Sequence, residues 1–429
     1  MLGFAIFAML FGAGNLVFPP YLGMHSGTNW LYGFIGYAVM DIVFAMVATL
    51  IIISRSDGAE GIVGVLGSRL SKLLIFLSYI CIGPLIAIPR TAATTYELSV
   101  ITLFPQFNPI LFSIIFFVIV LFISIKPLKI IDIIGAVLAP VLLITIGVMI
   151  VKGILYPIGS ITDGNTLYIS IKDGIMAGYQ TMDTIAMIIF SIIIISKIKN
   201  YKLENKSEEK KIIYYSCFIA GMALCIIYAG FTYLGATAAS VYSKDYSRAD
   251  IIINLSKDIL GSYGFWILAI IVAFACLTTA VGLVSSCSSY FHKFSNQKYS
   301  YSAFCILICI FSAIFCNFGL DHIIAFAAPI LDFIYPILLL LIVLSTIAEE
   351  KLSLKARYGA IIGVTIFVMI QLIENLAHTN YIVNKIPLSS YGFAWIIPAI
   401  TGLFIGMAVN RLIKAPIKEN IVSEIDNQS

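Results

Sequence analysis

The stretch "FGAGNLVFPPY", residues 11–21, interrupts the first hydrophobic run of the chain with two glycines and two prolines. Both residue types weaken the hydrogen-bond ladder of a helix, and a membrane offers freed backbone groups no water to bond. Such a break is tolerated inside a membrane where the freed backbone lines a cavity or binds a ligand. The alternative is a kinked helix whose glycines pack against neighbours. This stretch alone leaves both interpretations open.

The composition is that of a membrane protein. Hydrophobic residues make up 60% of the 429 residues, charged residues make up 11%, and the mean hydropathy is +1.02. A soluble protein of this length could not bury so much apolar surface. Period-2 alternation is absent, so an outer-membrane barrel is not expected. We predict an all-α polytopic membrane protein with about twelve spans, near residues 1–22, 29–53, 72–99, 108–126, 131–156, 174–196, 212–238, 262–290, 301–318, 322–347, 358–376 and 391–412.

The basic residues predict the orientation. If the N-terminus is cytoplasmic, the inside loops hold 19 lysines and arginines and the outside loops hold 6. The positive-inside rule then predicts that both termini are cytoplasmic, and the net charge of +4 reflects this loop bias rather than a nucleic-acid site. The chain begins apolar at once, without a basic n-region or a cleavage site, which argues against a signal peptide. Whether Met1 is the true start stays open.

A second break lies in the sixth span. The stretch "AGYQTMD", residues 177–183, is polar and contains glycine inside an apolar run. Spans one and six are five apart, so a five-helix repeat would insert its second copy upside down, and paired breaks of this kind indicate a transporter's midplane site. We predict a 5+5 inverted repeat with broken helices 1 and 6, covering residues 1–156 and 157–347. Residues 348–429 would hold two extra helices and a cytoplasmic tail.

The eighth span provides a possible cation site. Ala275, Thr278 and Thr279 are spaced i, i+3 and i+4 and therefore share one helix face. Two hydroxyls and a carbonyl are neutral oxygen ligands that suit a small hard cation such as Na⁺. Membrane threonines more often bond a carbonyl of their own helix, and for this motif alone that interpretation is favoured. A broken first helix nearby shifts the balance towards the cation.

Three motifs together resemble one known family. "LFGAGNLVFPPYLG", "GYQTMDTIA" and "ACLTTAVGL" resemble the bacterial branched-chain amino acid:cation symporters, over nearly the whole chain. The resemblance implies a leucine-transporter-like fold, a location in the bacterial cell membrane, and uptake of leucine, isoleucine and valine driven by Na⁺ or H⁺. It implies a cation between spans one and eight, and it implies an unwound segment in span one. The implied ligands are carbonyls near Ala8 and Phe11, the Ala275 carbonyl and the hydroxyls of Thr278 and Thr279, and the implied unwound residues are Gly12, Gly14 and Asn15.

A zwitterionic amino acid would use both ends of the broken helices. N–H groups at the start of a half-helix, from Leu16 onward, would face its carboxylate. Carbonyls at the end of the other half-helix, near residues 177–179, would suit its ammonium. We expect Tyr179 and Gln180 to provide polar contacts.

Four ionisable residues lie inside predicted spans, where each costs roughly 2.5–3.5 kcal/mol on insertion scales. They are Asp41, Arg90, Asp183 and Asp332. We expect Arg90 to pair with Asp183 or Asp332, either as a gate or brace of the site or as a static ion pair. Asp41 is a candidate for proton coupling.

Other function classes are less well supported. A channel would show filter loops or charge rings, and an enzyme would show a catalytic constellation. A phosphate-binding loop is absent as well. We predict a secondary symporter rather than an enzyme, without a resident cofactor or an obligate protein partner. A symporter for another small neutral solute, a channel and a membrane enzyme are the alternatives, in that order.

Overall fold

The computed structural model describes residues 2–54, 64, 68–125, 139–200, 206–347, 352–377, 379 and 381–426. Several predicted features lie outside these residues: Met1, the start of the fifth span at 131–138, and the loop residues Arg55, Lys126, Lys129, Lys202 and Lys351. The chain divides into two compact units, Met1–Ala59 with Ile75–Ala328 and Glu60–Leu74 with Pro329–Ser429. The predicted repeat boundaries remain a prediction.

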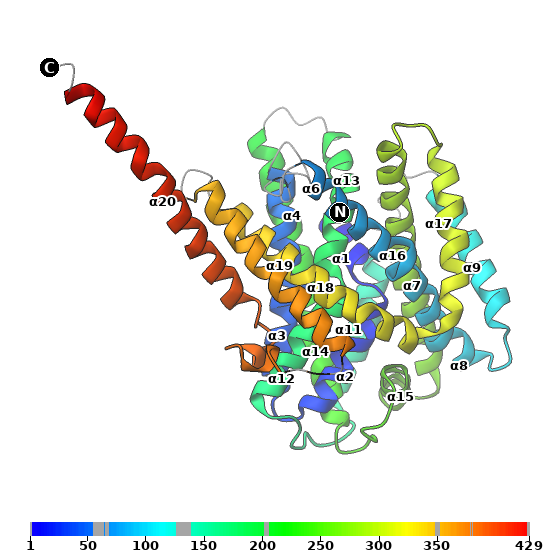
Figure 1. The fold of residues 1–429 in the computed structure, drawn as a ribbon. Helices are drawn as coiled ribbons and strands as arrows, with labels where there is room; N and C mark the ends of the chain where they lie inside the picture. The colour runs from blue at the N-terminus through cyan, green and yellow to red at the C-terminus, as the bar shows by residue number, and fades with distance from the viewer. Residues whose placement is uncertain are drawn as a thin grey trace. The chain divides into compact units, whose positions relative to one another are not determined.

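The first span is broken. Helix α1 (Leu2–Leu10) and helix α2 (Ala13–Ser26) are bent by 67° at the intervening residues, and both are drawn in dark blue in Figure 1. Gly12 is extended, with φ −122° and ψ −159°. The break is thus shorter than predicted, because Gly14 and Asn15 already lie in the first turn of α2. Pro19 and Pro20 do not interrupt the helix either, since both lie within α2.

The sixth span is broken within the predicted stretch. A single residue separates helix α12 (Leu167–Thr181) from helix α13 (Asp183–Asn200). The intervening Met182 is in the left-handed region, with φ 70°, and its N–H donates to the Tyr179 carbonyl. A side chain at positive φ costs free energy, so this conformation must be held by its surroundings.

The first unit is built from helices throughout its described part. Besides α1, α2, α12 and α13 it contains α3 (Trp30–Ala38), the π-helical turn η1 (Val39–Val43), α4 (Phe44–Ser54), η3 (Cys81–Leu85), α7 (Ala87–Thr95), η4 (Tyr96–Val100), α8 (Ile101–Leu103), α9 (Pro109–Ser124), α11 (Ala139–Leu155), α14 (Lys206–Ala238), α15 (Arg248–Leu260), η6 (Gly261–Tyr263), α16 (Gly264–Phe294), α17 (Tyr301–Phe315) and η7 (Cys316–Phe318). Helices α6 (Ser68–Ile80) and α18 (Leu320–Thr346) cross the boundary between the units.

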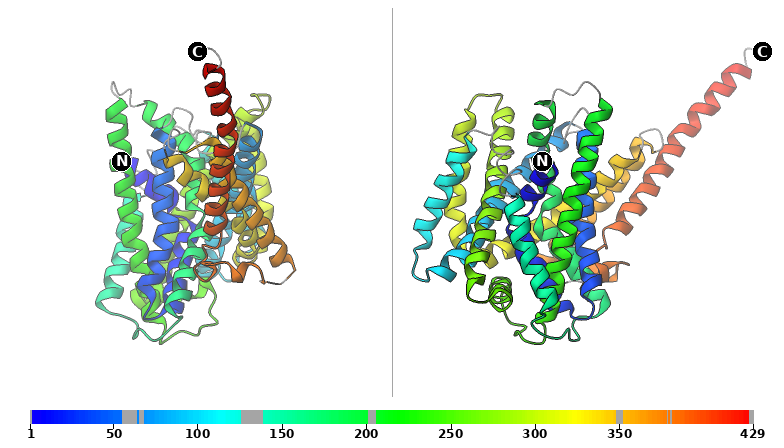
Figure 2. Two further views of the ribbon diagram at one scale, coloured as in Figure 1. Left: turned by 60° about the vertical axis from the view of Figure 1, so that its left-hand side comes forward. Right: turned by 180° about the vertical axis from the view of Figure 1, so that it is seen from behind.

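Glycines let the half-helices pack closely on their neighbours. A Cβ on Gly23 of α2 would lie 1.8 Å from the Thr232 carbonyl oxygen of α14. A Cβ on Gly174 of α12 would lie 2.1 Å from the Gly33 carbonyl oxygen of α3. The right-hand view of Figure 2 shows α12 and α14 beside α3. Small residues permit this approach in membrane bundles, and it holds α2 and α12 against rigid helices.

The second unit contains a close helix pair. Helices α19 (Leu354–Leu376) and α20 (Ile396–Asp426) are joined through the short turns η9 (Val383–Lys385) and η10 (Ser389–Tyr391). A Cβ on Gly359 would lie 2.1 Å from the Gly402 carbonyl oxygen, and a Cβ on Gly363 would lie 2.1 Å from the Pro398 carbonyl oxygen. This is the small-residue packing that is typical of membrane helices.

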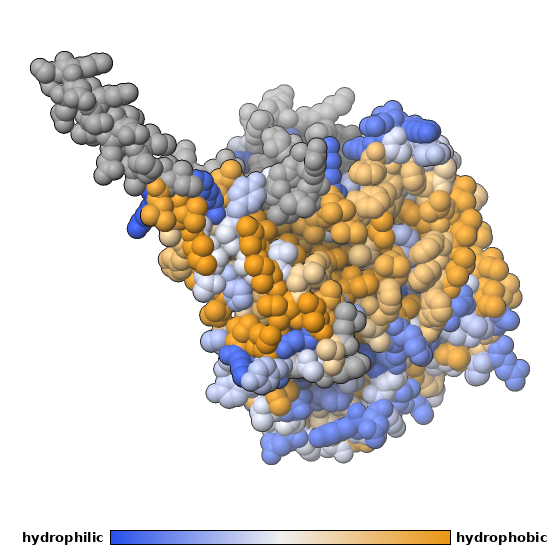
Figure 3. All heavy atoms as spheres, in the orientation of Figure 1, coloured by the Kyte–Doolittle hydropathy of each residue, from blue (hydrophilic) through white to orange (hydrophobic). Residues whose placement is uncertain are grey.

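The helices indicate a multi-pass membrane protein. Among the described residues, seven helices are long and apolar enough to cross a membrane, or eight if α1 and α2 form one span. The count of twelve stays a prediction. On α9 and α17, side chains such as Ile114, Val118, Ile310 and Ile314 are exposed, and Figure 3 shows an apolar surface over these helices. A bilayer would cover such a surface.

Candidate substrate and cation site

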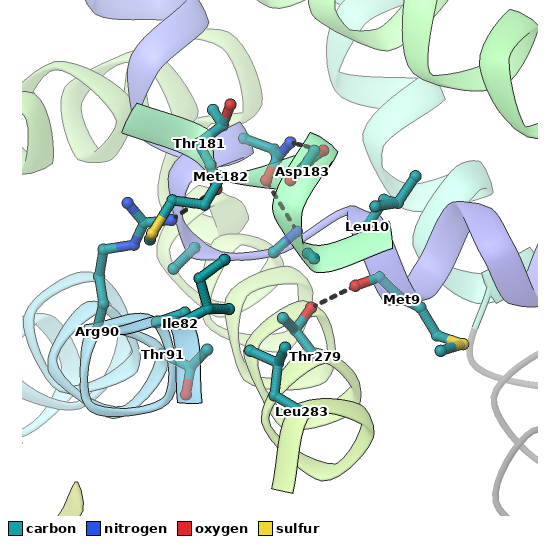
Figure 4. A pocket seen from close by; sticks show the side chains of 15 residues that line it. Met9, Leu10, Ile82, Arg90, Thr91, Thr181, Met182, Asp183, Thr279 and Leu283 are labelled. Atoms are coloured by element: carbon teal, nitrogen blue, oxygen red, sulfur yellow. Dashed lines mark hydrogen bonds between the residues drawn. The ribbon is translucent and has the colours of Figure 1, made fainter. Parts of the chain in front are cut away.

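The end of α1 exposes carbonyl oxygens to α16. Because α1 ends at Leu10, the Ala8 and Met9 carbonyls lose the i+4 donors of a continuing helix, whereas the Phe7 carbonyl still accepts from the Phe11 N–H at 2.8 Å. The Thr278 hydroxyl lies 3.1 Å from the Ala8 carbonyl oxygen and 2.9 Å from the Ala275 carbonyl oxygen, and it can donate to either. The Thr279 hydroxyl donates to the Met9 carbonyl at 3.2 Å (Figure 4). Neutral oxygens from both helices therefore converge here, as hard cations prefer.

Gly12 makes this approach possible. A Cβ at position 12 would lie 2.9 Å from the Thr279 hydroxyl oxygen, closer than a real Cβ contact. Met9 was missed by the sequence analysis, which expected the Phe11 carbonyl instead. The signal that would have found Met9 is the position of the helix end, since the carbonyls just before that end lose their i+4 donors. The expected role of the Phe11 carbonyl stays a prediction.

Asn15 connects the two broken helices. Its side-chain oxygen accepts from the Gly12 N–H at 3.2 Å, which caps the start of α2. Its side-chain nitrogen donates to Asp183 Oδ2 at 2.8 Å and also to the Tyr228 hydroxyl. Asn15, Asp183 and Tyr228 are all buried. One amide therefore bonds to the break in span one, to the first residue of α13 and to a side chain of α14. The α14 partner, Tyr228, was not predicted from the sequence.

Asp41 lies beside the second break. It sits in the π-helical turn η1, a feature that is frequent at functional sites. The Thr181 hydroxyl donates to Asp41 Oδ1, and the Thr184 hydroxyl donates to the Met40 carbonyl at 3.1 Å. The Asp41 side chain is fully buried. These bonds attach η1 to both halves of the sixth span, and no sequence pattern indicated Thr181 or Thr184 in this role.

Arg90 holds the end of α12. Its guanidinium donates to the Gln180 carbonyl at 2.5 Å and to the Thr181 carbonyl at 3.0 Å. The C-terminal end of a helix carries partial negative charge, so a buried cation is favourable there. The described contacts thus include carbonyl partners that the sequence analysis did not expect. Pairing of Arg90 with Asp183 stays a prediction, and so does pairing with Asp332, which lies in the other unit.

A small cavity lies among these residues. Its volume is about 20 Å³, enough for a single water-sized group. It is lined by both half-helices of spans one and six, by α7 and by α16. Figure 4 shows Arg90, Met182, Thr279 and Leu283 around it. The ionisable residues Arg90 and Asp183 therefore border the same small cavity.

The other predicted contacts fall at different places. Helix α2 begins at Ala13, so the N–H groups at its start are those of residues 13–15 rather than those from Leu16 onward. Gly14 lies beside Arg90, since a Cβ there would be 2.9 Å from Arg90 Nη2. Gln180 uses its carbonyl to bind Arg90, while Tyr179 is buried within α12 and does not line the small cavity. Substrate contacts of Tyr179 and Gln180 stay predictions.

Sequence comparison identifies relatives along the whole chain. Residues 1–413 match the model of the family described as "Branched-chain amino acid transport protein". A protein of Staphylococcus aureus (strain USA300) that is named as a branched-chain amino acid carrier is 34% identical, covering 97% of this chain and 98% of the relative. A protein of the same name from strain MRSA252 is 32% identical with the same coverage.

Structural comparison identifies transporters with the same fold. Mhp1, a nucleobase-cation-symport-1 family transporter in a closed conformation with bromovinylhydantoin bound, has a TM-score of 0.60 at 13% identity and covers 96% of this chain and 93% of that one. A Na⁺-coupled sialic acid symporter in a substrate-bound outward-open state has a TM-score of 0.58 at 14% identity, covering 95% and 89%. At these identities the likeness concerns the fold alone.

Proposed function

The chain belongs to the branched-chain amino acid transport protein family, and from this premise we propose that it imports leucine, isoleucine and valine as a Na⁺ symporter. Family membership identifies the chain as a membrane transporter and not an enzyme. The substrates, the coupling ion and the alternating-access mechanism are the proposal. We further propose that it works in the cell membrane with both termini in the cytoplasm and without an obligate protein partner.

One observation supports the cation site most strongly. The hydroxyls of Thr278 and Thr279 meet the carbonyls of Ala8 and Met9 at the point where α1 ends. Without a cation, the hydroxyl hydrogens occupy the space between these oxygens. Binding of Na⁺ would turn these hydrogens away, so that the hydroxyl oxygens of α16 and the carbonyl oxygens of α1 would all face the ion and be linked through it. Cation binding would thereby fix one half of the broken span that also borders the substrate cavity.

The substrate would bind between the helix ends. N–H groups at the start of α2 suit its carboxylate. The carbonyl end of α12 would suit its ammonium once Arg90 releases the Gln180 and Thr181 carbonyls. A cavity of about 20 Å³ is too small for a branched-chain amino acid. The half-helices must therefore separate for the substrate to enter, and this separation is the movement that alternating access requires.

Proton coupling is the second candidate. Asp41 and Asp183 are both buried, and each is bonded to an element of a break: Asp41 to Thr181 and Asp183 to Asn15. Gain or loss of a proton at either carboxyl would change these hydrogen bonds directly. If H⁺ drives transport, we propose that it binds at this pair of carboxyls.

Uptake into proteoliposomes tests the proposal. Purified protein is reconstituted, and uptake of radiolabelled leucine is compared under an inward Na⁺ gradient, an inward H⁺ gradient and no gradient. We expect uptake with Na⁺, and we expect unlabelled isoleucine and valine to compete for it. Uptake that requires only the H⁺ gradient would support leucine transport but would assign the coupling to the Asp41 and Asp183 carboxyls instead of the Na⁺ site. Absence of leucine uptake under both gradients would contradict the substrate and favour another small neutral solute.

A further inference from the structure

We propose that a second cavity, bordered by α2, α12 and the start of α15, binds the zwitterionic amino acid before it reaches the midplane. This inference rests on the proposed function, because it takes the transported amino acid as the ligand. The volume of this cavity is about 250 Å³. It is thus the larger of the two spaces, slightly below the range of about 300–1,000 Å³ that is typical of pockets for drug-sized ligands. We call it the Arg248 cavity.

Arg248 provides a fixed positive charge. It is the first residue of α15, and its guanidinium carbon lies 4.6 Å from the centre of the Tyr21 ring and 5.5 Å from that of Phe18. Such ring contacts orient a guanidinium. Among the described residues, its buried Nε has no hydrogen-bond partner. A planar guanidinium with an unused donor is well suited to bind a carboxylate.

The existing partner of Arg248 leaves room for a ligand. An Asp321 carboxylate oxygen lies 3.5 Å from Arg248 Nη1, and 56% of the Asp321 side chain is exposed. Exposed ion pairs contribute little free energy, with a median of about 0–1 kcal/mol. A substrate carboxylate can therefore bind to the guanidinium together with Asp321 or in its place.

Asp173 provides a negative charge in the same cavity. It lies on α12 and lines the Arg248 cavity, and its Oδ2 accepts from the Asn165 side-chain nitrogen at 2.9 Å. The Asn165 N–H in turn donates to the His25 carbonyl at 2.8 Å, which links the loop before α12 to the end of α2. The carboxylate is thus held by a bonded loop and is available to an ammonium group.

The remaining wall is partly apolar, with Tyr21, His25 and Gln180 as its other lining residues. Phe18 and Leu22 of α2 face the cavity together with Met176 and Ala177 of α12. One cationic group, one anionic group and an aliphatic wall are the three features that a branched-chain amino acid can satisfy at once. A free anion would not use Asp173, and a purely apolar ligand would gain nothing from either charged group.

The position of the cavity links it to the midplane site. The Gln180 residue borders the Arg248 cavity, and its carbonyl accepts from Arg90, which lines the small cavity. Both cavities therefore meet at the end of α12. On α2 the Arg248 cavity is lined by Phe18, Tyr21, Leu22 and His25, towards the end of that helix that the basic residues predict to be extracellular. An amino acid bound in this cavity would lie next to the break of the sixth span, at which we propose that the substrate binds.

Equilibrium binding of radiolabelled leucine to the purified full chain tests this inference. We expect two molecules of leucine per chain at saturation in Na⁺. Arg248→Gln removes a charge-assisted hydrogen-bond donor, so binding at one of the two sites should weaken about tenfold or more. Asp173→Asn should weaken the same site, and Arg248→Lys should restore part of the affinity. Lys257→Gln, which removes an exposed positive charge from the same helix, is the matched control and should retain both sites.

Two results would overturn the inference while leaving the proposed function intact. One is a single leucine per chain in the wild type that supports Na⁺-driven uptake. The other is two sites that persist unchanged in both folded variants, Arg248→Gln and Asp173→Asn. Failure of the proposed function is different, because leucine would then neither bind nor be taken up. Leucine methyl ester and N-acetylleucine, which each lack one charge, should compete poorly at the Arg248 cavity, and full competition by both would also overturn the inference.

Discussion

Asn15 is the residue on which both broken helices depend. Its amide caps the start of α2 through Gly12 and donates to Asp183 at the start of α13. Each of these partners is buried, so water does not replace a lost bond. A movement of one break must therefore be transmitted to the other or must break this amide's hydrogen bonds.

Replacement of Asn15 by leucine should destabilise the protein and abolish transport. The leucine has a similar size but leaves buried Asp183 without this donor, at a cost of about 1–3 kcal/mol. Thermal unfolding in detergent measures the loss of stability, and leucine uptake measures the loss of function. Asn254→Leu is a suitable control, since the Asn254 amide donates to the Asp250 carbonyl within its own helix. Equal unfolding temperatures of the wild type and Asn15→Leu would speak against this role.

Replacement of Gly12 by alanine should weaken cation binding and leave the fold intact. Gly12→Ala places a methyl group 2.9 Å from the Thr279 hydroxyl oxygen and must displace it. We expect a rise of about tenfold in the Na⁺ concentration that gives half-maximal uptake, the effect of losing about 1.4 kcal/mol. Gly147→Ala, where a Cβ meets no atom within 4 Å, should leave the Na⁺ dependence unchanged. An unaltered Na⁺ dependence in Gly12→Ala would contradict the geometry of the site.

Among the elements, α2 is held closely against a neighbouring helix. It packs backbone to backbone on α14, through Gly23 against Thr232 and through Gly235 against Pro20. The prolines that suggested a break thus lie inside a helix supported by a neighbour. Neighbouring helices can compensate for the hydrogen bonds that a proline removes from a membrane helix. The structural consequence is that α2 and α14 form one packed pair.

Gly23→Ala should separate this pair. The added Cβ would lie 1.8 Å from the Thr232 carbonyl oxygen, a backbone atom that cannot move without its helix. Overpacking of this kind typically costs about 1–3 kcal/mol, and we expect a lower unfolding temperature together with reduced uptake. The control is Gly221→Ala on α14, where the nearest atom would be 3.4 Å away. Stability equal to that of Gly221→Ala would show that the close packing is not needed.

On the scale of the whole molecule, the two breaks and the helix face that meets the first of them were predictable from the sequence. Glycine and polar residues inside apolar runs located both breaks, and the i, i+3, i+4 spacing identified Thr278 and Thr279. The exact ends of the half-helices of span one could not be predicted, because Pro19 and Pro20 remain helical when a neighbouring helix supports them. No sequence pattern predicts the left-handed backbone conformation of Met182 either.

Partners from distant helices were the least predictable. Tyr228 and Met9 join the site only through packing of helices far apart in the chain. Arg90 was expected to find a carboxylate, but carbonyls at the end of a broken helix are also acceptors for a buried cation. The twelve-span count, the inverted repeat and the orientation rest on the sequence and remain predictions.

We propose that the freed carbonyls of α1 and the hydroxyls of α16 together form the coupling cation site. The most direct measurement is the Na⁺ dependence of leucine uptake in Thr278→Val with Thr279→Val, compared with Thr237→Val, a buried threonine that donates to the Leu234 carbonyl of its own helix. We predict a half-maximal Na⁺ concentration at least about tenfold higher in the double variant, and no change in the control. A double variant that folds and keeps the wild-type Na⁺ dependence would contradict the account.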